Sequence, residues 1–327
     1  MLISVVVCTY NGTAYLREQL DSIRQQARPA DEVLIFDDVS SDNSAQLCAE
    51  YILSHRLGDT WRLTVNQRNL GFISNFRQAM KAARGDWVAL CDQDDVWTPD
   101  KLLRLADCAN QHSDASAIAG AFDVINSVGA QCPASLHRDI VGALKLPVGH
   151  RAHKLPSFLK DPYLLLLKNF APGCTLFVSR VVCEAYISHT REDIPHDWEL
   201  LIVAQMMDGL YYLGGCTTHY RIHGKNTIGV PSRNRNLIPS GSGRIRTVDC
   251  ADAILRAVKR YVSLIPGNHI GIANQYETFL VHRRRAFSHG SVKDFLSMLK
   301  YREIYVRMFT KKQRLGDWFA MFFGGVK

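Results

Sequence analysis

The chain has 327 residues, a length that suits one α/β domain of about 200–250 residues followed by a smaller segment. Apolar residues make up 47% and charged residues 21%, and these proportions exclude a mostly disordered chain, a collagen-like repeat and a coiled coil. No apolar run reaches the length of about 18 residues that a membrane-spanning helix needs. The opening residues, MLISVVVCTYNG, predict a buried strand rather than a signal peptide, because a basic start and a small-residue cleavage site are missing.

The formal net charge is +8, and its position along the chain limits the partners that it suggests. A basic excess is typical of proteins that bind nucleic acid, an anionic membrane surface or a phosphate-bearing substrate. Between residues 282 and 314, many lysines and arginines stand against only Asp294 and Glu303, whereas the N-terminal third is nearly balanced. No segment has the aromatic and basic pattern of an RNA-binding sheet. We therefore expect no nucleic-acid partner.

The nine cysteines are scattered along the chain and include no CxxC pair. An odd count without paired spacing argues against a disulfide framework and against a zinc site. Free thiols, buried in strands and kept in a reducing compartment, are the expectation.

Strand and helix patterns alternate over the first 110 residues. The expected strands are 2–9, 32–36, 61–65 and 87–91, and the expected helices are 15–26, 44–53, 75–83 and 100–109. Continuous apolar, β-branched runs are typical of strands that are buried on both faces of a parallel sheet. The alternation predicts an α/β fold with a doubly wound sheet, in which a ligand binds beyond the carboxyl ends of the strands.

The pattern is looser after residue 110. Further strands are expected at 115–122, 175–179 and 217–222, and helices at 200–207, 251–265 and 292–309. Residues 130–157 predict a long surface segment near the site, and residues 229–248 a linker or loop, because apolar periodicity is poor there.

Three polar clusters directly follow expected strands: Thr9-Tyr10-Asn11, Asp37-Asp38, and Asp92 to Asp95. The last cluster places three carboxylates within four residues, and such like charges persist when they are solvated or neutralised by a cation. A hard divalent cation with oxygen ligands, such as Mg²⁺, is the natural neutraliser. The alternative is a solvated acidic turn, but the polar ends of the neighbouring strands favour the cation site.

Three other groups leave alternatives open. The Asp38 carboxylate suits a hydrogen bond from a nucleotide-base imide, or an Asx-turn and helix cap. Asp197, at the start of an apolar helical run, is a helix cap or a general base. His223, within His-Gly-Lys-Asn, contacts a metal or a diphosphate, or belongs to an ordinary polar turn.

The sequence also lacks several well-known catalytic motifs. There is no GxGxxG after the first strand and no GxxxxGK[ST], so P-loop nucleotide hydrolysis is disfavoured. There is no GxSxG elbow and no HExxH pair either.

Taken together, the polar motifs resemble those of family 2 glycosyltransferases with a GT-A fold, and most of all bacterial rhamnosyltransferase-type enzymes of surface polysaccharide synthesis. The motifs are VVVCTYNG (5–12), FDDVSSD (36–42), NLG (69–71) with Asn75, GDW (85–87), CDQDDVW (91–97), HDW (196–198) and YRIHGKN (220–226). The resemblance covers residues 1 to about 228, in the family's order and spacing. Val39 and Glu199 depart from the family pattern but remove no catalytic group.

The resemblance implies a donor site built from the first polar clusters. Thr9, Tyr10 and Asp38 would line the pocket for the nucleotide base, with Asp38 pairing with its imide N–H. The accessory residues of this donor site would be Asn11, Asn75 and Asp92.

The resemblance also implies the residues of the chemistry. Asp94 would reach the ribose or the metal, and Asp95 would bind the Mg²⁺ or Mn²⁺ that bridges the donor diphosphate. His223 would complete the metal shell. Asp197 would be the catalytic base that deprotonates the acceptor hydroxyl.

The implied activity is an inverting, metal-dependent transfer of a single sugar from a nucleoside-diphosphate donor to a hydroxyl of a glycan or lipid-linked glycan acceptor. The donor would be a dTDP-sugar or UDP-sugar, with rhamnose as one candidate. The hydrophobic spans and the QxxRW motif of processive synthases are absent. Two alternatives are a sugar-phosphate nucleotidyltransferase, which would need a glycine-rich phosphate loop, and a non-catalytic membrane- or nucleic-acid-binding protein.

The predicted architecture is a GT-A type, Rossmann-like mixed sheet with a C-terminal helical extension. Residues 1–110 would form the nucleotide-sugar half, 111–228 the acceptor half, 229–250 a flexible linker and 251–327 the basic amphipathic extension. Within the extension, 301–325 would lie on an anionic membrane surface, whereas 251–300 would pack on the catalytic domain. This predicts a cytoplasmic protein associated peripherally with the inner face of the plasma membrane.

Overall fold

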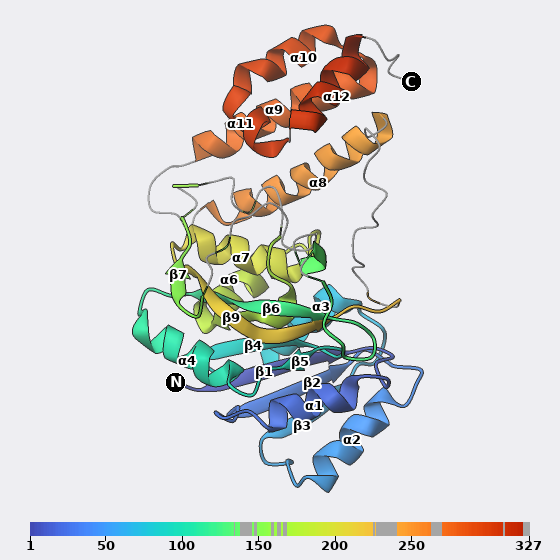
Figure 1. The fold of residues 1–327 in the computed structure, drawn as a ribbon, viewed down its shortest axis with the longest axis vertical. Coiled ribbons are helices and arrows are strands. Elements are labelled where there is room, and N and C mark those ends of the chain that lie inside the picture. Colours follow the sequence, from blue (N-terminus) through green and yellow to red (C-terminus); the bar gives the residue numbers. More distant parts are fainter. Residues whose placement is uncertain are drawn as a thin grey trace. The chain divides into compact units, whose positions relative to one another are not determined.

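The protein is described by a computed structural model (Figure 1). It describes residues 1–133, 135–137, 146, 149–157, 160–161, 165, 169–224, 226, 241–262, 270–309 and 311–322. The chain divides into two compact units. The first unit comprises Met1–Ser157 and Asn169–Val230, and the second comprises Phe158–Lys168 and Pro231–Lys327. The predicted division of the first unit at residue 110 stays a prediction.

The first unit is built on a nine-stranded mixed sheet with the order β3-β2-β1-β4-β8-β6-β9-β5, and β7 pairs with β9. The strands are β1 (Ile3–Thr9), β2 (Glu32–Asp37), β3 (Trp61–Val65), β4 (Trp87–Asp92), β5 (Val96–Trp97), β6 (Ala117–Ile125), β7 (Ala152–Lys154), β8 (Leu176–Ser179) and β9 (Leu210–Arg221). Strands β1 to β4 are parallel to one another, and β8 lies antiparallel between β4 and β6. The predicted mixed α/β sheet is therefore confirmed.

Helices cover both faces of this sheet (Figure 1). One group packs in a single core with the alternate β1 residues Val5 and Val7; it consists of α1 (Leu16–Arg24), α2 (Ser44–Ser54) and α4 (Lys101–Gln111). The second group lies on the opposite face and consists of α3 (Phe72–Ala82), α6 (Arg180–His189) and α7 (His196–Met206). Because apolar side chains cover both faces, every residue of β1 and of β2 is buried. Only the strand ends are left to carry polar chemistry.

The second unit is helical, and it corrects the predicted boundaries. Its elements are α8 (Gly241–Arg260), α9 (Ile270–His289), α10 (Val292–Met298), η3 (Leu299–Tyr301), α11 (Arg302–Met308) and α12 (Lys311–Phe322). The predicted linker 229–250 is wrong over its last ten residues, because α8 begins at Gly241. Val248, Ala251, Leu255 and Val258 recur at helical spacing and are buried, which explains the longer helix. Residues 227–240 lie outside the described part of the chain.

Two other features of the second unit bear on the expected helical extension. The predicted helical segment 292–309 is helical over 292–308, and a short 3-10 helix, η3, separates its two α-helices, α10 and α11. Helix α9 was not expected, although it buries Tyr276 and Phe279. In the described segments, none of the helices combines the length and hydropathy needed to cross a bilayer. All nine cysteines are free, as expected.

Candidate active site

The three polar clusters meet at one edge of the sheet, because their strands are neighbours. In the parallel pairing, Thr9 lies opposite Asp37 and Cys8 lies opposite Asp92. The Asp38 N–H also donates to the Thr9 carbonyl over 2.9 Å. The ends of β1, β2 and β4 therefore form one continuous polar edge, where a ligand of a doubly wound sheet is expected.

Asp38 is buried and binds the segment that follows β3. Its carboxylate accepts hydrogen bonds from the N–H groups of Leu70 and Gly71, both over 2.8 Å, and from Asn66 Nδ2 over 2.8 Å. Asn75 is also buried. Its side-chain amide donates a hydrogen bond to the Phe36 carbonyl and accepts one from Asn66. Both predicted donor-site residues thus position a loop. The base contact of Asp38 and the place of Asn75 in the donor site stay predictions.

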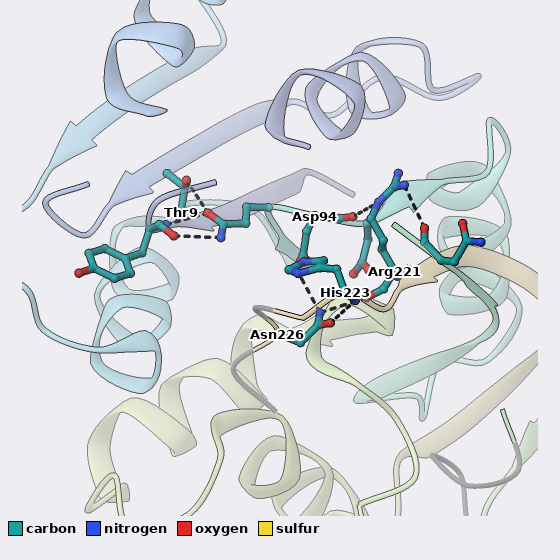
Figure 2. A network of polar contacts seen from close by, with 9 residues as sticks. Thr9, Asp94, Arg221, His223 and Asn226 are labelled. Atoms are coloured by element: carbon teal, nitrogen blue, oxygen red, sulfur yellow. Dashed lines mark hydrogen bonds and ion pairs between the residues drawn. The ribbon is translucent and has the colours of Figure 1, made fainter. Parts of the chain in front are cut away.

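Thr9 and Tyr10 are joined to the acidic loop by Gln93, as Figure 2 shows. Gln93 Oε1 accepts from Thr9 Oγ1 over 2.7 Å and from the Tyr10 N–H over 2.8 Å. The Tyr10 side chain is half exposed. Asn11 has a positive φ of 51° and accepts hydrogen bonds from Ser41, so it ties the β1 loop to the β2 loop. The Tyr10 side chain is therefore accessible to a ligand at this edge.

Asp92 and Asp95 lie next to Cys174, and their ligand atoms are within 4.8 Å of one another. Asp95 is fully buried, and its Oδ2 accepts no hydrogen bond from the described residues. Burial and the neighbouring Asp94 charge raise the pKa of Asp95 to about 7. Burial and the charge of Asp95 also raise the pKa of Asp92 well above its usual range. The pair therefore places two negative charges close together in a buried position whenever both groups ionise.

Asp94 faces a different set of partners from Asp95, and Figure 2 shows this network. Asp94 Oδ2 is 2.8 Å from His223 Nε2 and 3.4 Å from Asn226 Nδ2. Arg221, which is buried, donates its backbone N–H to Asp95 Oδ1 and its Nε to the Asp94 carbonyl. Asp95 and His223, the two predicted metal ligands, are thus linked indirectly: Arg221 contacts Asp95 and Asp94, and Asp94 contacts His223. The metal role of both stays a prediction.

Lys101 is a buried cation close to the acidic loop. Its Nζ donates to the Cys174 carbonyl over 2.5 Å and to Thr218 Oγ1 over 2.8 Å, and it lies 3.9 Å from the Trp97 ring centroid. Burial lowers the pKa of Lys101 to about 8, while nearby acids, including Asp95, oppose this shift. Lys101 therefore offsets part of the negative charge of the loop and anchors residue 174 beside it.

Asp197 is brought to the same region by η1 (Gly173–Thr175). It lies at the start of α7 and accepts hydrogen bonds from the Trp198 and Gly173 N–H groups, and the adjoining Cys174 belongs to the Asp92–Asp95 cluster. The charge of Asp197 contributes to the raised pKa of Asp92, as expected for nearby acids. Burial raises the pKa of Asp197 itself to about 6. A carboxyl group with this pKa can exchange protons near neutral pH.

The donor set around Asp95 fits a divalent cation. A buried carboxylate oxygen without a partner, beside a second carboxylate, gives the oxygen ligands that Mg²⁺ and Mn²⁺ prefer. Such an ion would also relieve the repulsion that raises both pKa values. Asp92 and Asp95 are the residues that would hold it, with Asp94 and His223 adjoining.

The structure brings together most of the predicted site residues, and it adds others. The added residues are Gln93, Lys101, Cys174 and Arg221. Arg221 could have been found from the sequence, because it ends an expected strand and lies two positions before His223. For Lys101 and Cys174 the sequence holds no local signal, because their role depends on burial beside distant residues.

Comparison with known proteins shows to which family the chain belongs. The family model described as glycosyl transferase family 2 matches residues 4–187. The chain belongs to glycosyl transferase family 2. The predicted family resemblance is therefore confirmed, and relatives named as glycosyltransferases support the same class of enzyme.

Two relatives show how far the sequence similarity extends. The chain is 34% identical over 143 residues to an uncharacterized Mycobacterium bovis protein, covering 42% of this chain and 41% of that one. It thus spans about two fifths of the length of this relative. It is 27% identical over 234 residues to the dTDP-rhamnosyl transferase RfbG of Shigella flexneri, covering 68% of this chain and 73% of that one.

Solved structures confirm the GT-A type of fold. The structure of the S. aureus protein TarS in complex with UDP-GlcNAc matches with a TM-score of 0.60 at 14% identity. The match covers 96% of this chain and 83% of the TarS chain. The structure of the mannosyltransferase PcManGT of Pyrobaculum calidifontis, in complex with GDP-Man and Mn²⁺, matches with a TM-score of 0.51 at 15% identity. The match covers 99% of this chain and 87% of the PcManGT chain. At these identities the likeness establishes the fold alone.

Proposed function

We propose that this family 2 protein is an inverting glycosyltransferase that moves one sugar from a nucleoside-diphosphate donor to an acceptor hydroxyl. The observation that carries the proposal is the placing of Asp197 beside the Asp92–Asp95 cluster through Gly173 and Cys174. A proton-accepting carboxyl and a site for diphosphate charge then lie at one edge of the sheet.

Asp197 is the proposed general base. A hydroxyl is a poor nucleophile at neutral pH, and a positioned carboxylate that takes its proton contributes roughly 10²–10⁴-fold. The acceptor oxygen bonds to the anomeric carbon as the bond from that carbon to the diphosphate breaks, and the hydroxyl proton passes to Asp197. Attack from the face opposite the leaving group inverts the anomeric centre.

The proposed metal is Mg²⁺ or Mn²⁺, held by Asp92 and Asp95 with Asp94 and His223 adjoining. When bound, such an ion stabilises the negative charge that develops on the leaving diphosphate. The chain's own residues prepare the place for it, since Arg221 fixes the backbone of the acidic loop and Lys101 fixes residue 174. The Mn²⁺ of PcManGT is in keeping with this proposal.

The proposed donor is a dTDP- or UDP-sugar, and the proposed acceptor is a lipid-linked glycan of a surface polysaccharide. The name of RfbG favours a dTDP-rhamnose donor, whereas UDP-GlcNAc in TarS favours a UDP-sugar. A base contact by Asp38 would serve both donors, because thymine and uracil share the imide group. A donor screen that measures nucleoside diphosphate release separates them.

The decisive test compares Asp197→Asn with Asp107→Asn in the full chain, using the donor found by the screen. Asp107 is an exposed acid on α4 and is the matched control. We expect Asp197→Asn to lower kcat by roughly 10²–10⁴-fold with an unchanged circular dichroism spectrum, and Asp107→Asn to keep full activity. Wild-type kcat should rise with pH through about 6, as Asp197 loses its proton.

Two results would remove the proposal. An active Asp197→Asn variant would exclude Asp197 as the base. Release of pyrophosphate from nucleoside triphosphate and sugar phosphate, without transfer from a nucleotide sugar, would assign the nucleotidyltransferase activity instead.

A membrane-facing role is proposed for α12. Its exposed large apolar side chains are Leu315, Trp318, Phe319 and Phe322, which recur at helical spacing on one side of the helix. Exposed Lys311 lies on the same helix. A basic helix with an apolar stripe binds anionic lipid surfaces, where a lipid-linked acceptor would lie.

The membrane proposal is tested by sedimentation with phosphatidylglycerol vesicles. We expect wild type to sediment with the vesicles and Phe319→Asp to stay in solution, whereas the control Val181→Asp, on exposed α6 surface, sediments like wild type. Failure of wild type to bind the vesicles would exclude the membrane role.

A further inference from the structure

Asp123, Cys216 and His219 form a second group of potential metal ligands, which the proposed transfer reaction does not use. Each offers one ligand atom, and these atoms lie within 4.8 Å of one another. Cys216 Sγ is 3.9 Å from His219 Nδ1. Tetrahedral zinc, with Zn–S of about 2.3 Å and Zn–N of about 2.0–2.1 Å, separates two such atoms by about 3.6 Å. The observed distance between Cys216 Sγ and His219 Nδ1 is thus within a few tenths of an ångström of their distance in a bound site.

A bulge in β9 puts the two β9 ligands on the same face of the sheet. Residues three apart in a regular strand point to opposite faces, because side chains alternate. Here the register with β6 shifts, so that Ala121 pairs with Cys216 and Asp123 pairs with His219. Thr217 is the extra residue, and the register change turns His219 to the face of Cys216 and Asp123.

Contacts from several elements hold the bulge in place. Arg104 of α4 donates to the carbonyls of Gly214 over 2.6 Å and of Cys216 over 2.8 Å. Thr217 Oγ1 donates to the Ala121 carbonyl over 2.9 Å. A Cβ at Gly120 would lie 2.4 Å from Thr217 Oγ1, so only glycine fits there. The backbone that carries Cys216 and His219 is therefore fixed before any ion binds, which lowers the cost of binding.

The group also borders an open space. Asp123 and His219 line a cavity of about 220 Å³ together with Glu18 and Gln131. Three protein ligands with one open side are the arrangement in which zinc keeps its fourth position for water or an exchangeable ligand.

We propose that Asp123, Cys216 and His219 bind a Zn²⁺-type ion whose fourth ligand comes from the cavity. One thiolate, one imidazole and one carboxylate select a borderline-soft ion such as Zn²⁺ over Mg²⁺. On binding, a metal–sulfur bond replaces the S–H bond of Cys216, and the proton leaves to solvent. Cys216 and His219 are a Cys-x-x-His pair on one strand, and Asp123 comes from the neighbouring strand. This set lacks the CxxC spacing from which a zinc site is usually predicted.

The test uses Co²⁺ as a spectroscopic substitute for Zn²⁺ in the full chain, after removal of metal with a chelator. We expect one equivalent of Co²⁺ to give a thiolate-to-cobalt charge-transfer band that Zn²⁺ abolishes and Mg²⁺ does not. Cys216→Ser should lose the band, and its Zn²⁺ affinity should fall by more than the roughly 10–100-fold that loss of an outer-shell partner costs.

Two cysteine controls make the result specific to this group. Cys132→Ser removes another half-buried thiol, and Cys174→Ser removes the thiol beside Asp95. Both variants should keep the band, and a circular dichroism spectrum identical to that of wild type checks the fold of each. Absence of the band in wild type, or its loss in Cys174→Ser with retention in Cys216→Ser, overturns the proposal. No sugar donor is present in this experiment, so its outcome is independent of the proposed transfer reaction.

Discussion

Asp38 and Asp95 are buried aspartates at the same edge of the sheet, yet their surroundings differ. Asp38 accepts three hydrogen bonds from Asn66, Leu70 and Gly71. Asp95 accepts one backbone hydrogen bond, from the Arg221 N–H, and lies against the Cys174 thiol, and its Oδ2 has no hydrogen-bond donor within the part of the chain that is described. A carboxylate with several donors holds a loop in place, whereas a buried carboxylate with an oxygen left over indicates where a ligand belongs.

The largest expected effect is on the pH dependence of stability without metal. Burial and the Asp94 charge raise the pKa of Asp95 to about 7, against about 3.9 for an aspartate in an unfolded chain. Because the native state holds this proton more tightly, its stabilising contribution is complete below about pH 4 and is lost as pH rises through about 7. The difference corresponds to roughly 4 kcal/mol at most.

Urea unfolding with a chelator present, from about pH 4 to pH 8, measures this effect as the difference between wild type and Asp95→Asn. The variant lacks the titration and should gain stability relative to wild type as pH rises. Parallel stability curves would show that Asp95 has an ordinary pKa and would break the comparison with Asp38.

The next effect is on catalysis. Asp95→Asn should lower transfer by roughly 10²–10³-fold, because charge stabilisation of the leaving diphosphate is lost. Steady-state kinetics over a range of Mn²⁺ concentrations would measure it, and a weaker apparent Mn²⁺ affinity should accompany the loss. Full activity with unchanged Mn²⁺ dependence would remove the metal assignment.

The smallest effect concerns Asp38. Asp38→Ala should lower the free energy of unfolding by about 3 kcal/mol, because it leaves the buried donors of Asn66, Leu70 and Gly71 without their acceptor. Thermal and urea unfolding at neutral pH measure the loss, with Asp107→Ala as the exposed control. A free energy of unfolding equal to that of wild type would mean that the Asp38 carboxylate does not hold the loop. The contrast drawn between Asp38 and Asp95 would then be wrong.

The edge of the sheet was predictable, because it follows from local patterns. The apolar runs before Thr9, Asp37 and Asp92 predict parallel strands, and parallel strands bring their polar ends together. Asp197 and His223 were candidates from the sequence with alternatives open, and the family resemblance gave each of them a role. Of these, the structure ties Asp197 to the acidic cluster and His223 to Asp94.

The remaining features depend on contacts that no local pattern encodes. The antiparallel position of β8 between β4 and β6 brings Cys174 to the acids, although it lies about 80 residues after them in the chain. The burial of Lys101 and Arg221 opposes the usual exposure of charged residues, so composition predicts surface positions for both. The start of α8 was missed because glycine and serine precede its apolar repeat.

The burial of Lys101 makes it a natural reporter on the integrity of the site. Its ammonium group is enclosed by the Cys174 carbonyl, Thr218 and the Trp97 ring, so an acylating reagent reaches it only when α4 separates from the sheet. The lysine side chains at the surface react in every state of the protein. The extent of acylation at Lys101, read by mass spectrometry, therefore gives the fraction of molecules in which the first unit has opened.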